Sequence, residues 1–124
     1  MEHRVERTVD LPAPVSRVWR ALTDQGEFEA WFHPGAKEAI EPSAVEQERL
    51  LAFRWHPYDH DYAAGTPTLV ELRLEPTDGG TRLKLSESEF ERIPIGRRGE
   101  VFHLSDERWK SRLKDLRTYV SGGA

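Results

Sequence analysis

The amino-acid sequence predicts an α+β domain in which an antiparallel sheet packs against one long C-terminal helix. Segments with alternating apolar residues lie between helical segments, an order typical of antiparallel sheets rather than of parallel βαβ units. The last segment carries a single apolar stripe at helical spacing, so it must pack on the sheet. The chain has 124 residues, the length of one domain, which we place at residues 1–124.

The N-terminal part predicts a strand followed by two helices. Residues 4–11 alternate loosely between apolar and charged side chains, as a half-buried strand does. Pro12 ends this strand, and Pro14 suits the first turn of a helix. Apolar residues then recur at steps of three and four, first over residues 15–22 and again, in a shorter helix, over residues 28–32.

The middle of the chain predicts a sheet with one clear hairpin. Alternating strands are expected at residues 50–56, 68–75 and 81–88. The last two flank Asp78-Gly79-Gly80, a strong hairpin signal. Residues 34–47 show no clean period, and only a short strand near residues 39–40 is expected there.

The C-terminal helix is predicted from its apolar stripe, formed by Phe102, Trp109, Leu113, Leu116 and Val120. The helix ends at Ser121-Gly122-Gly123. Its start is expected at Ser105 or several residues earlier, and residues 90–99, rich in Gly and Arg, are expected to form a loop.

Composition excludes several classes of function. The net charge is −4 and no block of Lys and Arg occurs, so we expect no nucleic-acid partner. The absence of cysteine excludes disulfides, thiolate nucleophiles and zinc–thiolate sites. No apolar run has the length of a membrane span or of a signal sequence, so we expect no membrane insertion and a cytoplasmic location. No cofactor is expected.

Four segments in order carry a resemblance to a known superfamily. They are residues 13–24 followed by Trp31-Phe32, residues 51–55, the hairpin of residues 72–90, and the last helix with Trp109, Leu113, Leu116 and Tyr119. The chain resembles the START-like (SRPBCC, polyketide cyclase-like) superfamily, in particular the group named for the homologue of the activator of the 90-kDa heat-shock protein ATPase. The resemblance implies a helix-grip (Bet v 1-like) fold, with a cavity between a curved sheet and the last helix. Members bind lipids, hormones or polyketides, and a few act as cyclases or hydrolases.

The sequence departs from this family in one segment. Similar proteins usually carry a Gly-rich strand pair between the second helix and the strand that begins here at Leu51, where this chain has residues 34–47. We therefore expect a shortened sheet with an open edge. A second copy of the chain could cover such an edge, so homodimerisation is considered.

The candidate ligand-binding residues are those expected to face the space between the sheet and the last helix. They are Phe53, Trp55, Leu72, Leu85, Glu87, Phe90, Phe102 and Trp109. Strict alternation places Glu87 on the inward face of its strand, where burial raises the pKa of a carboxyl group. It could then orient a polar ligand group or accept a proton. The favoured interpretation, however, is that the strand ends or bulges before Glu87, which leaves the side chain in solvent.

Two further groups of polar residues have both a functional and a simpler interpretation. His56, Asp59, His60 and Asp61 form a metal-like cluster, but their spacing matches no established site, and we expect a solvated loop and no metal. Arg97-Arg98 could bind an anion or gate the cavity, but a solvated turn is favoured.

These observations favour a non-enzymatic module that binds a small hydrophobic molecule. One alternative, which rests on the family name, is a co-chaperone that stimulates a heat-shock chaperone ATPase. Another is a cyclase- or hydrolase-like enzyme that uses Glu87. It ranks last because the sequence indicates one inward carboxylate and no partner acid or base.

Overall fold

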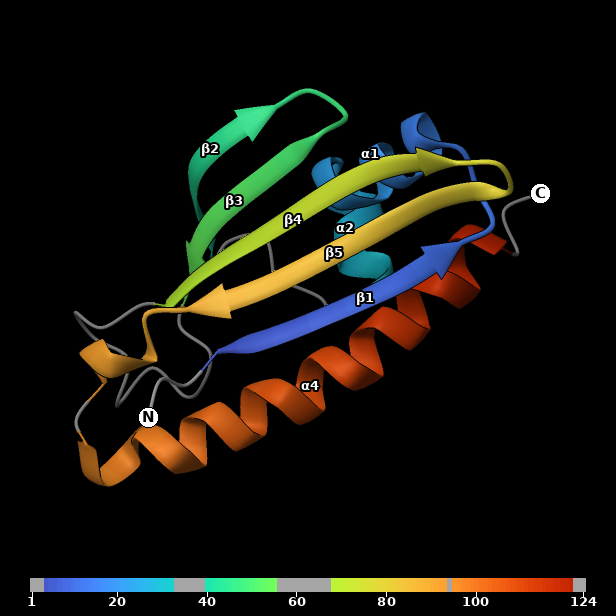
Figure 1. Cartoon of the computed structure of the whole chain (residues 1–124). Coiled ribbons are helices and arrows are strands. Elements are labelled where there is room, and N and C mark those ends of the chain that lie inside the picture. The colour runs from blue at the N-terminus through green and yellow to red at the C-terminus, as the bar shows by residue number, and fades with distance from the viewer. Residues whose placement is uncertain (1–3, 33–39, 56–67, 94, 122–124) are drawn as a thin grey trace.

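The structure is a computed structural model that describes residues 4–32, 40–55, 68–93 and 95–121. The elements are β1 (Val5–Leu11), α1 (Val15–Thr23), α2 (Gln25–Trp31), β2 (Ile40–Glu46), β3 (Leu50–Trp55), β4 (Thr68–Thr77), β5 (Gly80–Ser88), the short 3-10 helix η2 (Phe90–Arg92) and α4 (Ile95–Ser121). The five strands form one antiparallel sheet in the order β1-β5-β4-β3-β2. The long helix α4 runs beside β1, and α1 and α2 lie behind the sheet (Figure 1). The predicted α+β helix-grip architecture is confirmed.

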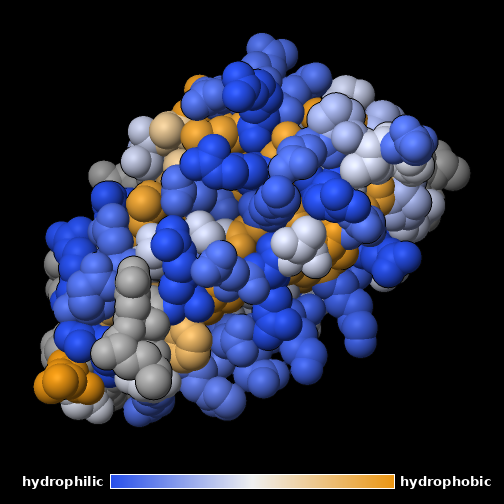
Figure 2. Space-filling view, in the orientation of Figure 1, coloured by the Kyte–Doolittle hydropathy of each residue, from blue (hydrophilic) through white to orange (hydrophobic). Residues whose placement is uncertain are grey.

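The sheet separates an apolar inner face from a charged outer face. On β4 and β5 the buried residues alternate with exposed ones, and the inner positions include Leu72, Leu74, Leu83 and Leu85. This period of two is the signal that predicted both strands. Lys84 Nζ lies 2.8 Å from a Glu75 carboxylate oxygen on the outer face. The face shown in Figure 2 is mostly hydrophilic. None of the described helices is long and apolar enough to cross a membrane.

Strand β2 corrects the sequence prediction for residues 34–47. It runs over Ile40–Glu46 as a seven-residue strand at the edge of the sheet, where only a short strand near residues 39–40 was expected. Pro42 and a register shift between Pro42 and Ala44 break its alternation. Proline and a bulge both weaken pairing at a sheet edge, although Val45 is exposed there. Homodimerisation through this edge stays a prediction.

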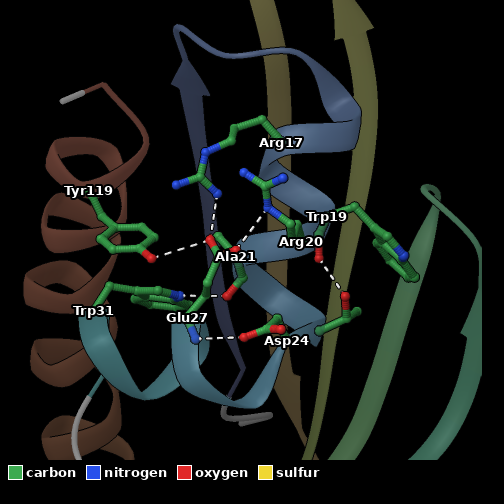
Figure 3. Close-up of polar contacts among 9 residues, drawn as sticks. Arg17, Trp19, Arg20, Ala21, Asp24, Glu27, Trp31 and Tyr119 are labelled. Carbon is green, nitrogen blue, oxygen red and sulfur yellow. Dashed lines mark hydrogen bonds and ion pairs between the residues drawn. The ribbon is translucent and has the colours of Figure 1, made fainter. Parts of the chain in front are cut away.

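Helices α1 and α2 are fixed to each other by side-chain caps and buried polar contacts. Asp24 is the N-cap of α2, and its carboxylate accepts a hydrogen bond of 3.0 Å from the Glu27 backbone N–H. The Trp31 indole donates to the Ala21 carbonyl at 2.8 Å. Figure 3 shows these contacts between the two helices. Trp31 therefore belongs to the core, as expected, whereas Trp19 packs against the core half-buried.

The carboxylate of Glu27 connects three helices. It accepts from Arg17 at 2.6 Å, pairs with Arg20 at 2.8 Å, and accepts from the Tyr119 hydroxyl of α4 at 3.2 Å (Figure 3). Burial opposes ionisation of Glu27, but the hydrogen bond and charge of Arg17 outweigh it and hold the pKa of this carboxyl below its ordinary value. The C-terminal half of α4 is thereby held against α1 and α2.

Helix α4 begins earlier than predicted. Residues 90–99 were expected to form a loop, but Phe90–Arg92 is a 3-10 helix and α4 starts at Ile95. The Arg98 guanidinium donates to the carbonyls of Phe90, Glu91 and Ile93, with its shortest contact of 2.8 Å to Glu91. Arg98 thus caps the preceding turn, and the favoured interpretation as a solvated turn is corrected. The glycines in this stretch hid the helix, because each costs about 1 kcal/mol relative to alanine.

The β4–β5 hairpin depends on Gly80. Thr77 pairs with Gly80 across the two-residue turn, and a Cβ atom at Gly80 would lie 2.1 Å from the Leu11 carbonyl oxygen. No atom lies within 4 Å of a Cβ atom built at the neighbouring Gly79. The backbone of β1 can approach this turn only because Gly80 lacks a side chain.

Gly80→Ala is therefore expected to lower the free energy of unfolding by about 2 kcal/mol or more, because the backbone around Leu11 must shift. Gly79→Ala is the matched control and should change it by no more than about 0.5 kcal/mol. Urea unfolding followed by circular dichroism measures both. Equal effects of the two substitutions would contradict the role of Gly80.

Candidate functional site

The candidate site is built around the carboxylate of Glu87, which lies on β5 and is fully buried. In the register of the sheet it stands in a row with Phe53, Val70 and Val5, all on the inner face. Glu87 therefore points inward, as strict alternation indicates, and the favoured interpretation of a solvated strand end is wrong.

Glu87 accepts hydrogen bonds from three elements. Its Oε2 accepts from the Trp55 indole of β3 at 3.0 Å and from the Thr68 hydroxyl of β4 at 2.5 Å. Its Oε1 accepts from the Trp109 indole of α4 at 2.9 Å. The carboxylate therefore ties the sheet to the middle of α4. Donors of this kind are what a buried carboxylate requires.

The charge of Glu87 is not fully compensated. Burial raises the pKa of the Glu87 carboxyl above its ordinary value, and the hydrogen bonds from Thr68 and the two indoles offset only part of that rise. The Ser105 hydroxyl is also fully buried and lowers the pKa slightly, although it makes no hydrogen bond of ordinary geometry. Glu87 can therefore accept a proton at a milder pH than an exposed glutamate.

Aromatic rings pack around this carboxylate. The Trp55 and Trp109 rings lie 5.3 Å apart between centroids, and Phe32 contacts them edge-on at 5.3 and 5.5 Å. Phe53 contacts Trp55 at 6.0 Å. We call Phe32, Phe53, Trp55 and Trp109 the aromatic cluster. Its rings are buried, and each of its two indoles points its N–H at Glu87.

Two arginines of α4 lie over this cluster. The Arg108 guanidinium lies 5.6 Å from the centroid of the Trp55 ring, and that of Arg112 lies 5.8 Å from the Phe32 ring. Such cation–π contacts attract a guanidinium to the face of an aromatic ring. Burial lowers the pKa of Arg108, and the charge of Glu87 opposes this change.

The remaining predicted site residues are also placed by the structure. Leu72 and Leu85 are buried in the core of the sheet. Phe90 is buried, and its ring contacts that of the half-buried Phe102 at 5.5 Å, beside η2. The structure thus brings Phe53, Trp55, Glu87 and Trp109 together. Whether any of the eight predicted residues contacts a ligand stays a prediction.

Sequence reasoning missed five residues of the site: Phe32, Thr68, Ser105, Arg108 and Arg112. Thr68 pairs with Trp55 across β3 and β4, which can be predicted only once the strand register is known. Ser105 lies four positions before Trp109 and Arg112 three positions after it, so helical spacing places both beside it. Arg108 directly precedes Trp109 and is placed only by its contact with the Trp55 ring.

A groove beside the aromatic cluster opens to the surface between α2 and α4. It has a volume of about 630 Å³. Its lining includes Trp31, Phe32, Arg112 and Tyr119. Phe32 is the residue of the aromatic cluster that lines this groove. The groove therefore reaches Phe32, whose ring contacts both Trp55 and Trp109.

The metal-like cluster of His56, Asp59, His60 and Asp61 lies outside the described residues. Within residues 4–32, 40–55, 68–93 and 95–121, no group of three or more His, Asp or Glu side chains is placed to hold a metal ion.

A curved antiparallel sheet packed against a long C-terminal helix is the helix-grip fold of the START-like superfamily. Residues 37–121 match the family model described as "Activator of Hsp90 ATPase homolog 1-like protein". This match spans more than half of the chain, and the chain belongs to that family.

Solved structures share this fold. Protein MLL2253 from Mesorhizobium loti superposes with a TM-score of 0.80 at 20% identity, covering 98% of each chain. DynU16, a protein of the dynemicin biosynthetic locus, gives 0.75 at 25% identity over 99% of this chain and 49% of its own. The Aha1 dimer from Colwellia psychrerythraea gives 0.70 at 10% identity over 94% and 95%. The search of curated proteins found no match.

The raised pKa of Glu87 makes stability depend on pH. The carboxyl is protonated more readily in the folded than in the unfolded protein. The contribution of Glu87 to stability is therefore fully present below the pKa that this carboxyl has in the unfolded protein. It is lost as the pH rises through the higher pKa of the folded protein. The free energy of unfolding of the wild type should fall across that window.

Glu87→Gln should remove this part of the pH dependence, although the amide loses one hydrogen bond and lowers stability at every pH. Urea unfolding of both proteins between pH 4 and pH 9 measures the difference. Glu71→Gln, on the outer face of β4, is the matched control and should leave the wild-type profile in place. Parallel profiles for Glu87→Gln and the wild type would show that Glu87 does not titrate in this way.

Proposed function

We propose that this domain binds a small hydrophobic molecule between the sheet and α4, with the aromatic cluster as the apolar surface and Glu87 as the polar anchor. The observation that carries the proposal is the fully buried Glu87 carboxylate, which accepts hydrogen bonds from two indoles and a threonine. Desolvating a carboxylate is unfavourable, and a core that only needed to be filled would be served by an apolar residue.

The chemistry of the anchor suits a ligand with a hydroxyl or amide group. Glu87 Oε2 already accepts two hydrogen bonds, from Trp55 and Thr68, whereas Oε1 accepts one, from Trp109. A further lone pair is therefore available at Oε1 for a ligand donor. A protonated Glu87 can also donate. One group can therefore hold either a donor or an acceptor within an otherwise apolar surface.

The approach to the anchor runs through the groove between α2 and α4. Phe32 lines that groove and also contacts both indoles that hold Glu87. A ligand that displaces the Phe32 ring would stack on Trp55 and Trp109 and reach the carboxylate. Moving the Phe32 ring is a smaller change than separating α4 from the sheet, because α4 is also held by the hydrogen bond from the Tyr119 hydroxyl to Glu27 of α2.

The co-chaperone and enzyme functions have less support from the structure. The Aha1 dimer from Colwellia psychrerythraea shares the fold at 10% identity, which is too low to assign its partners to this chain. An enzyme using Glu87 needs a second acid or base. Among the described residues, the side chains that donate hydrogen bonds to Glu87 are Trp55, Thr68 and Trp109, and none of these titrates near neutral pH.

Ligand binding is tested with the fluorescent probe anilinonaphthalene sulfonate and a panel of fatty acids and aromatic metabolites. We expect at least one compound to bind saturably at one site per chain. At 100 times its Kd it should raise the free energy of unfolding by about 2.7 kcal/mol. Titration calorimetry and thermal unfolding provide the two measurements.

Two variants locate the binding. Trp55→Phe removes an indole from the aromatic cluster and should weaken binding at least fivefold, whereas Trp19→Phe, on α1, should leave the Kd within twofold. If no compound of the panel binds saturably, or if both variants behave alike, the proposed site is wrong.

A further inference from the structure

Arg108 and Arg112 lie one helical turn apart on α4 and face the same aromatic cluster. Their guanidinium groups lie over the rings of Trp55 and Phe32 at 5.6 and 5.8 Å. Arg112 also lines the groove between α2 and α4. A guanidinium is planar and presents its N–H groups as a fork that matches a planar acceptor such as a carboxylate.

Most other arginines in the described chain meet a carboxylate. The pairs are Arg7–Asp106, Arg17–Glu27, Arg20–Glu27, Arg49–Glu46, Arg54–Glu89, Arg73–Glu71, Arg82–Asp10 and Arg92–Glu89. Arg98 instead donates to backbone carbonyls. Against this background, a half-buried arginine without a carboxylate contact stands out.

Arg108 is such a residue. Within the described ranges it makes no ion pair, although it is half-buried and burial lowers its pKa. The negative charge that acts on Arg108 is that of Glu87, and the positive charge of Arg112 repels it. Glu87 does not contact Arg108, because its hydrogen bonds come from the two indoles and Thr68. The cation is thus partly desolvated, and it makes no hydrogen bond to another described side chain.

Arg112 is only partly compensated. Its Nη1 lies 3.0 Å from Asp115 Oδ2, but its Nε is buried and has no hydrogen-bond partner among the described atoms. Glu29 and Asp115 also line the groove. Asp115 is engaged with the Nη1 side of the guanidinium, so the Nε–H is the donor left over. A buried unmet donor is unfavourable unless a ligand or water accepts from it.

We propose that Arg108 and Arg112 bind the carboxylate group of a small amphipathic acid whose apolar body packs in the groove and against the aromatic cluster. This inference rests on the proposed ligand-binding function and adds the chemical class of the ligand. A carboxylate is planar and presents two oxygens, which matches the forked donors of a guanidinium better than a point charge does. It would satisfy the Arg112 Nε–H and supply the missing counter-charge of Arg108.

The position of the two arginines also orients the ligand. Glu87 lies fully buried against the N–H groups of Trp55 and Trp109, whereas the half-buried guanidinium groups lie over the rings of Trp55 and Phe32. An anion is repelled by the first site and attracted by the second. The acid group therefore stays at the arginines near the surface, and the apolar body points inward.

The test compares each acid with a neutral analogue of the same shape. Titration calorimetry with the full chain uses naphthaleneacetate against naphthaleneacetamide, and decanoate against decanol. The wild type should bind at least one acid about tenfold or more tightly than its neutral analogue, the ratio expected for one charge-assisted contact.

Variants at the two arginines assign the effect. Arg108→Gln and Arg112→Gln should each reduce the preference for the acid to about twofold or less while leaving the Kd of the neutral analogue within threefold. Lys110→Gln removes the same charge from an exposed position of the same helix and should keep the preference. Arg108→Lys keeps the charge without the fork and should retain only part of it. Urea unfolding confirms that each variant is folded.

The outcomes separate this inference from the function on which it rests. Equal binding of acid and neutral analogue by the wild type overturns the carboxylate site and leaves hydrophobic ligand binding in place. A preference that survives both arginine substitutions, or is lost equally in Lys110→Gln, also overturns it. If other compounds of the wider panel bind but none of these four does, the proposed ligand class is wrong. If no compound of that panel binds, the proposed function is wrong as well.

Discussion

The burial of the Glu87 carboxylate between the sheet and α4 is the constraint on which the rest of the structure depends. A desolvated carboxylate is tolerated only when donors surround it, and here they come from three different elements, through Trp55, Thr68 and Trp109. A shift of one residue in β5 would turn Glu87 to the outer face. The register of β3, β4 and β5 and the rotation of α4 must therefore all be correct at once.

Helix α4 is held at three points along its length, and this fixes the space that faces the sheet. In its N-terminal half, Asp106 pairs with Arg7 of β1 at 2.8 Å. In its middle, Trp109 donates to Glu87. Toward its end, Tyr119 donates to Glu27 of α2. The groove between α2 and α4 lies between the second and third of these points, where the contacts are ring against ring and therefore easier to rearrange.

The parts of this arrangement that follow a strict period could be predicted from the sequence, and the parts that depend on pairing could not. Alternation along β5 placed Glu87 inside, and helical spacing placed Trp109 on the buried stripe. Thr68 could not be assigned because its role comes from lying opposite Trp55. Strand β2 was mostly missed because a bulge after Pro42 breaks its alternation, and the first turns of α4 were missed because Gly96 and Gly99 argue against a helix.

The indole of Trp55 lies between the two opposite charges of the site and couples them. Its N–H donates to Glu87 at 3.0 Å, and its ring face lies 5.6 Å from the Arg108 guanidinium. The attraction of Glu87 opposes the lowering of the Arg108 pKa by burial, so the arginine is held in place partly by a charge that it does not touch. An anion bound at Arg108 would add negative charge near Glu87 and raise the pKa of Glu87 further. By linkage, protonation of Glu87 would strengthen the binding of that anion by the same free energy. In the proposed ligand complex, the Glu87 carboxyl and the Arg108 guanidinium would therefore act as one site, because the Trp55 indole contacts both.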